Sequence, residues 1–141
     1  MGLAVGMSSQ MLIRPAVADE MTERFDPVAC LDERVRHQAR PAGPVAPGRY
    51  MEVQGHEQTL LIPLGRDVMR IGRGLAADLH LDESSVSRRH AILVHRASGA
   101  RILDDRSANG TFVNGHRIQQ VDLRDGDVVV IGRVVLRYLE L

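Results

Sequence analysis

Aromatic residues are scarce in this chain: among 141 residues there are two tyrosines, two phenylalanines and no tryptophan. Proteins that bind single-stranded nucleic acids usually stack successive bases on aromatic side chains. The basic and acidic residues balance at 18 each, so the formal net charge is zero. A neutral chain is not attracted over long range to nucleic acid or to an anionic membrane. The composition therefore predicts a protein with neither a nucleic-acid partner nor a membrane partner.

Cysteine is almost absent as well, because Cys30 is the only one. One cysteine cannot form an intramolecular disulfide or supply a cysteine-rich zinc site. The histidines are scattered without the spacing of metal ligands, so we expect no metal and no cofactor. No stretch approaches the length of a membrane span, and the start lacks the order of segments found in a signal peptide. These features favour a cytoplasmic protein.

The first part of the chain carries a helical pattern. Asp26 followed by Pro27 is typical of a helix N-cap with proline in the first turn. Apolar residues then recur at helical spacing from Val28 to Val35, and basic residues follow at the C-terminal end. This pattern predicts a short helix over residues 27–39.

A proline-rich stretch at residues 41–48 separates this arm from the remainder. Such a stretch cannot hold a helix and is typical of a semi-rigid linker. We therefore expect a partly disordered N-terminal arm and linker over residues 1–47 and one folded domain over residues 48–141.

Beyond Gly48 the pattern changes to short β-rich runs separated by turn residues. The clearest turn is Asn114-Gly115, because both central residues of a two-residue hairpin turn need positive φ. About ten runs follow at close spacing without helical periodicity, which predicts an all-β sandwich. The expected strands include 60–64, 68–71, 79–81, 91–95, 101–103, 111–113, 117–118, 128–131 and 134–139.

Polar and basic side chains gather in the loops between these runs. Arg73 follows Gly72 at a strand end, Ser87 lies in a second loop and Asn109 in a third. A guanidinium fork can hold two oxygens of one phosphate, while a hydroxyl and loop N–H groups can donate to the others. A carboxamide both donates and accepts, which suits pairing with a peptide backbone. This set suits binding of a tetrahedral dianion better than a bond-making reaction.

Six motifs follow one another in the loops and turns of this part of the chain: Gly72-Arg73, Val86-Ser87-Arg88-Arg89-His90, Ser107-Ala108-Asn109-Gly110-Thr111, Val113-Asn114-Gly115, Leu123-Arg124-Asp125-Gly126-Asp127 and Ile131-Gly132. In order and spacing, these motifs resemble the forkhead-associated (FHA) domain family over roughly residues 49–141. The family is a β-sandwich of about eleven strands, and it reads phosphorylated motifs with arginine clusters.

The resemblance implies a phosphothreonine-dependent adaptor that is not an enzyme. Arg73 and Ser87 would hold the phosphate with help from Arg88, and Asn109 would hold the main chain of the bound peptide. The partner would be a phosphothreonine-containing protein, with a Ser/Thr protein kinase upstream. Structural roles are implied for Gly72, His90, Asn114 and Gly115.

Three further positions follow from the same resemblance. Ser85 and Ala108 stand where some members of the family contact the peptide, so both are candidate peptide contacts. Some members also fold a phosphorylated N-terminal threonine back into their own pocket. Thr22, the only threonine before the domain, lies among acidic residues and is a candidate for such phosphorylation. The alternative is an ordinary threonine in a tail.

Two other functions compete with this hypothesis. Ser87, His90 and Asp105 suggest a hydrolase, but no Gly-x-Ser-x-Gly elbow or α/β alternation accompanies them. A basic rim of Arg66, Arg70, Arg73, Arg88 and Arg89 suggests a nucleic-acid-binding module, which the neutral charge disfavours. A purely structural β-module would leave the loop residues unexplained.

Overall fold

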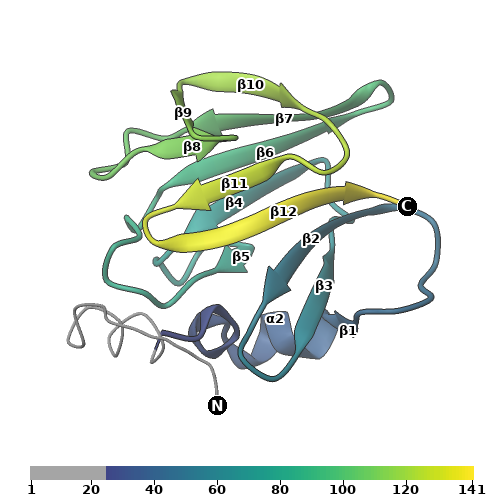
Figure 1. The fold of residues 1–141 in the computed structure, drawn as a ribbon. Helices are drawn as coiled ribbons and strands as arrows, with labels where there is room; N and C mark the ends of the chain where they lie inside the picture. The colour runs from purple at the N-terminus through teal and green to yellow at the C-terminus, as the bar shows by residue number, and fades with distance from the viewer. Residues whose placement is uncertain (1–24) are drawn as a thin grey trace, which may run out of the picture.

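The computed structural model describes residues 25–141, which form two β-sheets packed face to face with a helical segment against them (Figure 1). Thr22 lies outside the described residues. The seven-stranded sheet has the order β1-β3-β2-β12-β11-β8-β9, and the five-stranded sheet has the order β10-β7-β6-β4-β5. The expected all-β sandwich is confirmed.

All neighbours in the seven-stranded sheet are antiparallel, whereas the five-stranded sheet ends in the parallel pair β4–β5. The first sheet consists of β1 (Arg40–Pro41), β3 (Thr59–Pro63), β2 (Arg49–Gln54), β12 (Val134–Glu140), β11 (Val128–Ile131), β8 (Thr111–Val113) and β9 (His116–Ile118). The second consists of β10 (Gln120–Leu123), β7 (Gly99–Asp104), β6 (Ala91–Arg96), β4 (Val68–Gly72) and β5 (Leu79–His80).

The sandwich forms because apolar residues alternate along its strands. In β12, Val134, Leu136 and Tyr138 are buried while Val135 and Arg137 between them are exposed. Alternation of this kind places one face of each strand in the core between the sheets. The expected strands are all present, with ends that differ by one or two residues.

The hairpin turn at Asn114-Gly115 has the predicted geometry, with φ of 51° and 84° at the two positions. The Asn114 carboxamide also donates to Asp127 Oδ1 at 2.9 Å and accepts the Val128 N–H at 3.0 Å. It thereby ties the β8–β9 turn to the turn before β11, which is a structural contact within the scaffold.

The N-terminal segment forms two short helices in place of the single predicted one. A 3-10 helix, η1, spans Pro27–Cys30, and the α-helix α2 spans Glu33–Gln38. Asp26 caps the first, as its sequence indicated, but Asp32 caps a second helix by accepting the Val35 N–H at 2.8 Å. A second helix therefore starts within the stretch that the sequence predicted to be a single helix.

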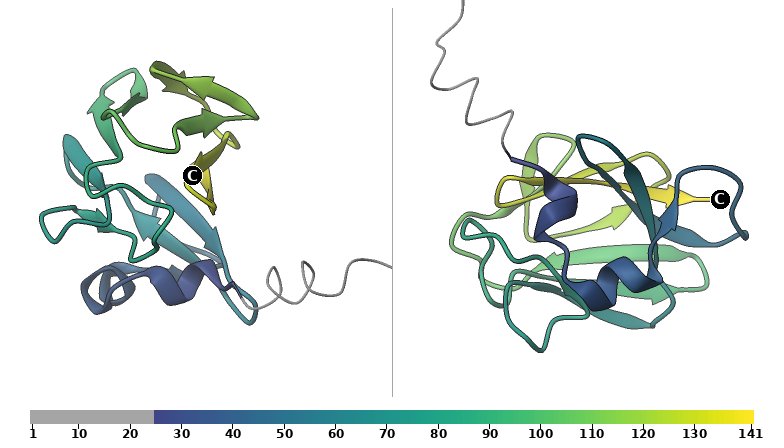
Figure 2. Two further views of the ribbon diagram at one scale, coloured as in Figure 1. Left: turned by 90° about the vertical axis from the view of Figure 1, so that its left-hand side faces the viewer. Right: turned by 90° about the horizontal axis from the view of Figure 1, so that it is seen from below.

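Both short helices pack on the sandwich (Figure 2). Val28, Cys30, Leu31 and Val35 are buried in the same core as the strands. Burial raises the pKa of the Cys30 thiol to about 11, so the cysteine is an inert core residue. Residues 25–39 therefore share the core of the sandwich, while the division of the chain at residue 47 stays a prediction.

Candidate phosphate-binding site

Three loops at one end of the sandwich meet around Ser87. Arg73 lies directly after β4, Ser87 lies between β5 and β6, and Ala108 lies between β7 and β8. The Arg73 N–H donates to the Ser87 carbonyl at 2.9 Å, and the Ala108 N–H donates to Ser87 Oγ at 2.9 Å. The structure thus brings the loops of Arg73, Ser87 and Asn109 together.

The first two loops approach each other closely because residue 72 is glycine. A Cβ atom at Gly72 would lie 2.1 Å from the carbonyl oxygen of Arg88, closer than any real contact. Gly74 continues the pairing, since its N–H donates to the same Arg88 oxygen at 3.1 Å. Without side chains at these positions, the main chain of Arg73 can lie directly against the Ser87 loop.

Arg73 has its orientation fixed without losing its capacity to bind. Its Nε donates to the Val86 carbonyl at 3.0 Å, which leaves the two terminal amino groups of the guanidinium for a ligand. Arg88 is exposed, and its main-chain oxygen is already used by Gly74. Arg73 therefore keeps donors for an anion, and Arg88 adds an exposed positive charge on the same loop as Ser87.

His90 supports the site from inside the molecule. It is 0% exposed, and its Nδ1 accepts the Ser87 N–H at 3.0 Å. A ring nitrogen that accepts carries no proton, so Nε2 is the protonated nitrogen and donates to the Gly110 carbonyl at 2.9 Å. One buried imidazole thus links the Ser87 loop to the loop of Asn109.

The loop of Asn109 is held in shape by Asp104 at the end of β7. The Asp104 carboxylate accepts the Ser107 N–H at 3.1 Å, the Ser107 hydroxyl at 2.5 Å and the Thr111 hydroxyl at 2.7 Å. Burial acts to raise the pKa of Asp104, but the hydrogen bonds from Ser107 and Thr111 outweigh it and hold the pKa below its ordinary value. The carboxylate is thus stabilised in its charged form while it orders the loop.

Asn109 reaches across to the second loop, where its Nδ2 donates to the Ser85 carbonyl at 2.8 Å. This bond orients the carboxamide and leaves its oxygen to accept from a ligand. Ser85 is itself fixed, because its hydroxyl donates to Glu83 and accepts the Arg133 N–H at 2.9 Å. The proton of the Ser85 hydroxyl and one of its two lone pairs are therefore used within the chain.

Glu83 and Arg133 complete a part of the site that the sequence did not reveal. The Arg133 Nη2 lies 3.1 Å from Glu83 Oε1, and the other carboxylate oxygen holds Ser85. Burial acts to raise the pKa of Glu83, but hydrogen bonds from Ser85 and the charge of Arg133 outweigh it, so that pKa is lowered. The pair comes from loops 50 residues apart, and no spacing in the sequence signals it.

The arrangement does not resemble that of a hydrolase. His90 accepts from the main-chain N–H of Ser87 and is fully buried, so it is not placed to activate the hydroxyl. Asp105 lies 3.2 Å from the exposed Arg89 Nε instead of orienting His90. Within residues 25–141, no cluster of three potential metal ligands occurs, and no helix is long and apolar enough to cross a membrane.

The basic rim of the nucleic-acid alternative is partly neutralised by acidic neighbours. Arg66 lies 3.3 Å from Asp78, and Arg89 is paired with Asp105. A pocket of about 400 Å³ lies between Arg70, Leu75 and Arg88, next to the Arg73 loop. The rim is therefore an interrupted set of charges around a recess and offers no continuous basic groove to a nucleic-acid backbone.

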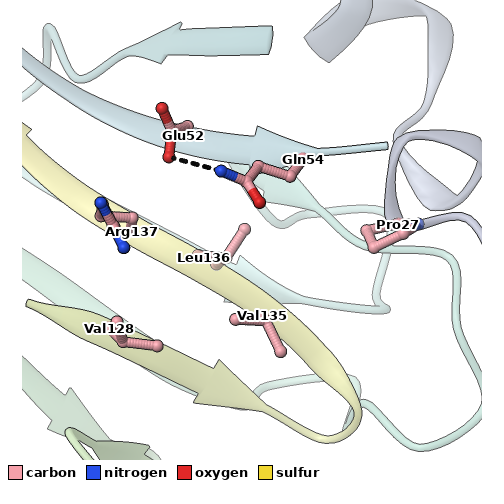
Figure 3. A pocket seen from close by; sticks show the side chains of 7 residues that line it. All are labelled: Pro27, Glu52, Gln54, Val128, Val135, Leu136 and Arg137. Carbon is pink, nitrogen blue, oxygen red and sulfur yellow. Dashed lines mark hydrogen bonds between the residues drawn. The ribbon is translucent and has the colours of Figure 1, made fainter. Parts of the chain in front are cut away.

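A separate small cavity of about 160 Å³ lies on the outer face of the seven-stranded sheet (Figure 3). Glu52, Gln54, Val135 and Arg137 surround it, and the Gln54 amide donates to Glu52 at 3.5 Å. None of the predicted phosphate-binding or peptide-binding residues lines it. This cavity is therefore a feature of another face of the molecule.

Comparisons with known proteins agree with the geometry. Residues 69–132 match the family model of the FHA domain. An oxoglutarate dehydrogenase inhibitor of Corynebacterium diphtheriae is 32% identical over 97 residues, covering 69% of this chain and 68% of that protein. The chain belongs to the FHA domain family.

Two solved structures have a similar fold. One, from a structural and functional analysis of phosphothreonine-dependent FHA domain interactions, is 31% identical and covers 66% of this chain and 96% of that chain, with a TM-score of 0.60. The other is Mycobacterium tuberculosis EmbR in complex with a low-affinity phosphopeptide, 32% identical, covering 76% of this chain and 28% of that chain, with a TM-score of 0.61. FHA domains similar to this chain thus take part in phosphothreonine-dependent interactions.

Several relatives are much longer than the region they share with this chain. The ABC transporter ATP-binding/permease protein Rv1747 of Mycobacterium tuberculosis is 47% identical over 72 residues, which cover 51% of this chain but 8% of the transporter. The shared part is the FHA region, so the likeness concerns the recognition module and not the transporter's activity.

Proposed function

We propose that this chain is a phosphothreonine-dependent binding adaptor, acting in the cytoplasm downstream of a Ser/Thr protein kinase. The observation that supports the proposal is that three loops meet at Ser87: the Arg73 N–H donates to its carbonyl, the Ala108 N–H donates to its hydroxyl oxygen, and the Asn109 side chain donates to the carbonyl of nearby Ser85. Arg73 and Ser87 would hold the phosphate, Arg88 would add a second positive charge, and Asn109 would pair with the peptide main chain. Its partner would be a protein that carries phosphothreonine.

The energetics of such a site are sufficient for specific recognition. A hydrogen bond to a charged group contributes about 1.5–3 kcal/mol, and three or four of them outweigh the cost of ordering a short peptide. Selectivity for threonine over serine would rest on burial of one methyl group, worth about 1 kcal/mol. Discrimination between the two is then about fivefold, while the unphosphorylated peptide loses the dianion entirely.

A peptide library screened in parallel phosphothreonine, phosphoserine and unphosphorylated forms tests the proposal. We expect binding to phosphothreonine peptides in the micromolar range, weaker binding to phosphoserine and none to unphosphorylated peptides. The same screen with single-stranded and duplex oligonucleotides tests the alternative. Binding to oligonucleotides that falls steeply with added salt, without phosphopeptide binding, would favour a nucleic-acid module.

We also propose that Thr22, when phosphorylated, occupies this site within the same chain. Its acidic surroundings support the idea, and so does its place three residues before Phe25, which packs on Arg133 beside Ser85. Full-length protein phosphorylated at Thr22 should bind an external phosphothreonine peptide at least tenfold more weakly than unphosphorylated protein, because an intramolecular ligand has a high effective concentration. Calorimetry on both forms measures this, with Thr22→Ala treated with the same kinase as the control. Equal affinity of the two forms would exclude self-binding.

A further inference from the structure

His80 lies between the N-terminal segment and the main chain of Arg73. Its Nε2 is 2.9 Å from the Arg73 carbonyl oxygen, and its Nδ1 is 3.1 Å from Asp32 Oδ2. The distance between His80 Nδ1 and Asp32 Oδ2 is that of an ion pair, but the two groups are not aligned as in a hydrogen bond. The imidazole is only 8% exposed, so both contacts are shielded from water. One side chain thus joins α2 to the arginine that would hold the phosphate.

Asp32 connects His80 to a well-anchored helix. Its other carboxylate oxygen, Oδ1, accepts the Val35 N–H and caps α2, while Val35 itself is 1% exposed. The neighbouring Arg34 donates to the Ala77 carbonyl at 2.7 Å. The helix is therefore fixed against the segment that leads from Arg73 to His80.

The residues just before α2 are joined to the chain just after His80. Leu31 and Leu81 form an isolated antiparallel bridge, and the Asp82 N–H donates to the Cys30 carbonyl at 2.7 Å. This contact lies at the start of the loop between β5 and β6, which contains Ser87. The N-terminal segment therefore contacts the connection between Arg73 and Ser87 along its middle, from Ala77 to Asp82.

Phe25 provides a second route to the same loop. The Arg133 guanidinium lies over the Phe25 ring at 4.0 Å from its centroid, and Arg133 also contacts Glu83. Glu83 in turn holds the main chain of Ser85 at 2.8 Å. Contacts from residues 25–35 thus reach both Arg73 and the opposite side of the Ser87 loop.

We propose that residues 25–39 are part of the phosphopeptide-binding unit and that His80 is a positioning residue for Arg73. The N–H and the Nε of Arg73 donate to carbonyl oxygens of the Ser87 loop, and the Arg73 carbonyl oxygen is held by His80. Loss of the His80 contact leaves the peptide unit between Arg73 and Gly74 held by the Gly74 N–H to Arg88 alone, so Arg73 is held less firmly and its guanidinium spends less time aimed at the phosphate. The inference rests on the proposed function and extends its unit beyond the predicted boundary at residue 48.

Four substitutions at His80 and Asp32 in the full chain test this with a phosphothreonine peptide taken from the library screen. His80→Val removes both contacts and should weaken binding about fivefold, the equivalent of one ordinary hydrogen bond. In His80→Gln the side-chain amide reaches the position of Nε2, whereas in His80→Asn it reaches only that of Nδ1. We therefore expect Gln to restore most of the affinity and Asn to restore little. Asp32→Asn keeps a good helix cap and should weaken binding about twofold by removing the charge.

Calorimetry gives the affinities, and thermal unfolding of the same samples separates positioning from stability. His95→Val is the matched control, because His95 is a partly buried histidine in β6 with one side-chain contact, to Arg49. Wild-type affinity in His80→Val and Asp32→Asn, with or without a lower melting temperature, would overturn the inference. So would equal affinities of His80→Gln and His80→Asn. Absence of binding by the wild-type chain would instead reject the proposed function, so the two failures are distinguishable.

Discussion

Replacing Arg73 with alanine is expected to weaken phosphothreonine-peptide binding at least a hundredfold. The side chain can supply two charge-assisted hydrogen bonds to one phosphate, each worth about 1.5–3 kcal/mol. A loss of about 2.7 kcal/mol corresponds to a hundredfold change in the dissociation constant. Calorimetry with the phosphothreonine peptide measures the change directly.

The Arg73→Ala variant should remain folded, because most of its native contacts come from the main chain. Its N–H to Ser87 and its carbonyl contact to His80 persist with any side chain. Only the bond from Nε to Val86 is lost, at a cost of about 1 kcal/mol. Arg137→Ala on the outer face of the seven-stranded sheet removes the same charge and is the matched control. Wild-type affinity in Arg73→Ala, or equal losses in both variants, would contradict the assignment of Arg73 to the phosphate.

The positions of the site loops could be predicted because they follow from where apolar runs stop. Arg73 comes directly after a strand that ends at Gly72, and Asn109 lies in the loop between β7 and β8. In a sandwich such loops gather at the ends of the sheets, so residue type and strand order are enough to suggest a shared site. The remaining parts of the site depend on pairings between distant segments.

Three features of the structure could not be obtained in this way. The apolar spacing from Val28 to Val35 indicates a buried face but not which surface covers it. The pairing of Glu83 with Arg133 joins loops that no local pattern relates. Strand β10 is only four residues long, and two of them, Gln120 and Asp122, are polar; pairing with β7 makes it a strand. Each of these features depends on tertiary contacts, and in β10 they override local propensity.

The N-terminal segment packs on the sandwich although the predicted domain boundary, at residues 47 and 48, lies after it. Composition separates residues 41–48 from the sandwich, yet residues before that stretch are buried in its core. A proline-rich sequence limits helix formation, but it does not prevent the segment before it from folding back. Strand β1, Arg40–Pro41, lies at the start of this stretch and pairs with β3, which returns the chain to the sheet edge. Compositional boundaries and boundaries of packing therefore fall at different residues here.

Replacing Gly72 with alanine is expected to lower the free energy of unfolding by about 3 kcal/mol or more. The added Cβ would lie 2.1 Å from the Arg88 carbonyl oxygen and 3.0 Å from that of Ser87. Both neighbours are main-chain atoms of the site loop, so relief requires that loop to move away from β4 and give up the Arg73–Ser87 hydrogen bond. Chemical denaturation of the full chain measures the change.

Gly65→Ala is the matched control for this prediction, because no atom lies within 4 Å of a Cβ placed there. It adds the same methyl group and should change the stability by no more than about 0.5 kcal/mol. The Gly72→Ala variant should also bind the phosphothreonine peptide at least tenfold more weakly, since Arg73 and Ser87 are forced apart at the point where they meet. Equal stabilities of the two alanine variants would show that the Ser87 loop yields at little cost. The close approach of β4 to that loop would then not be what fixes the site.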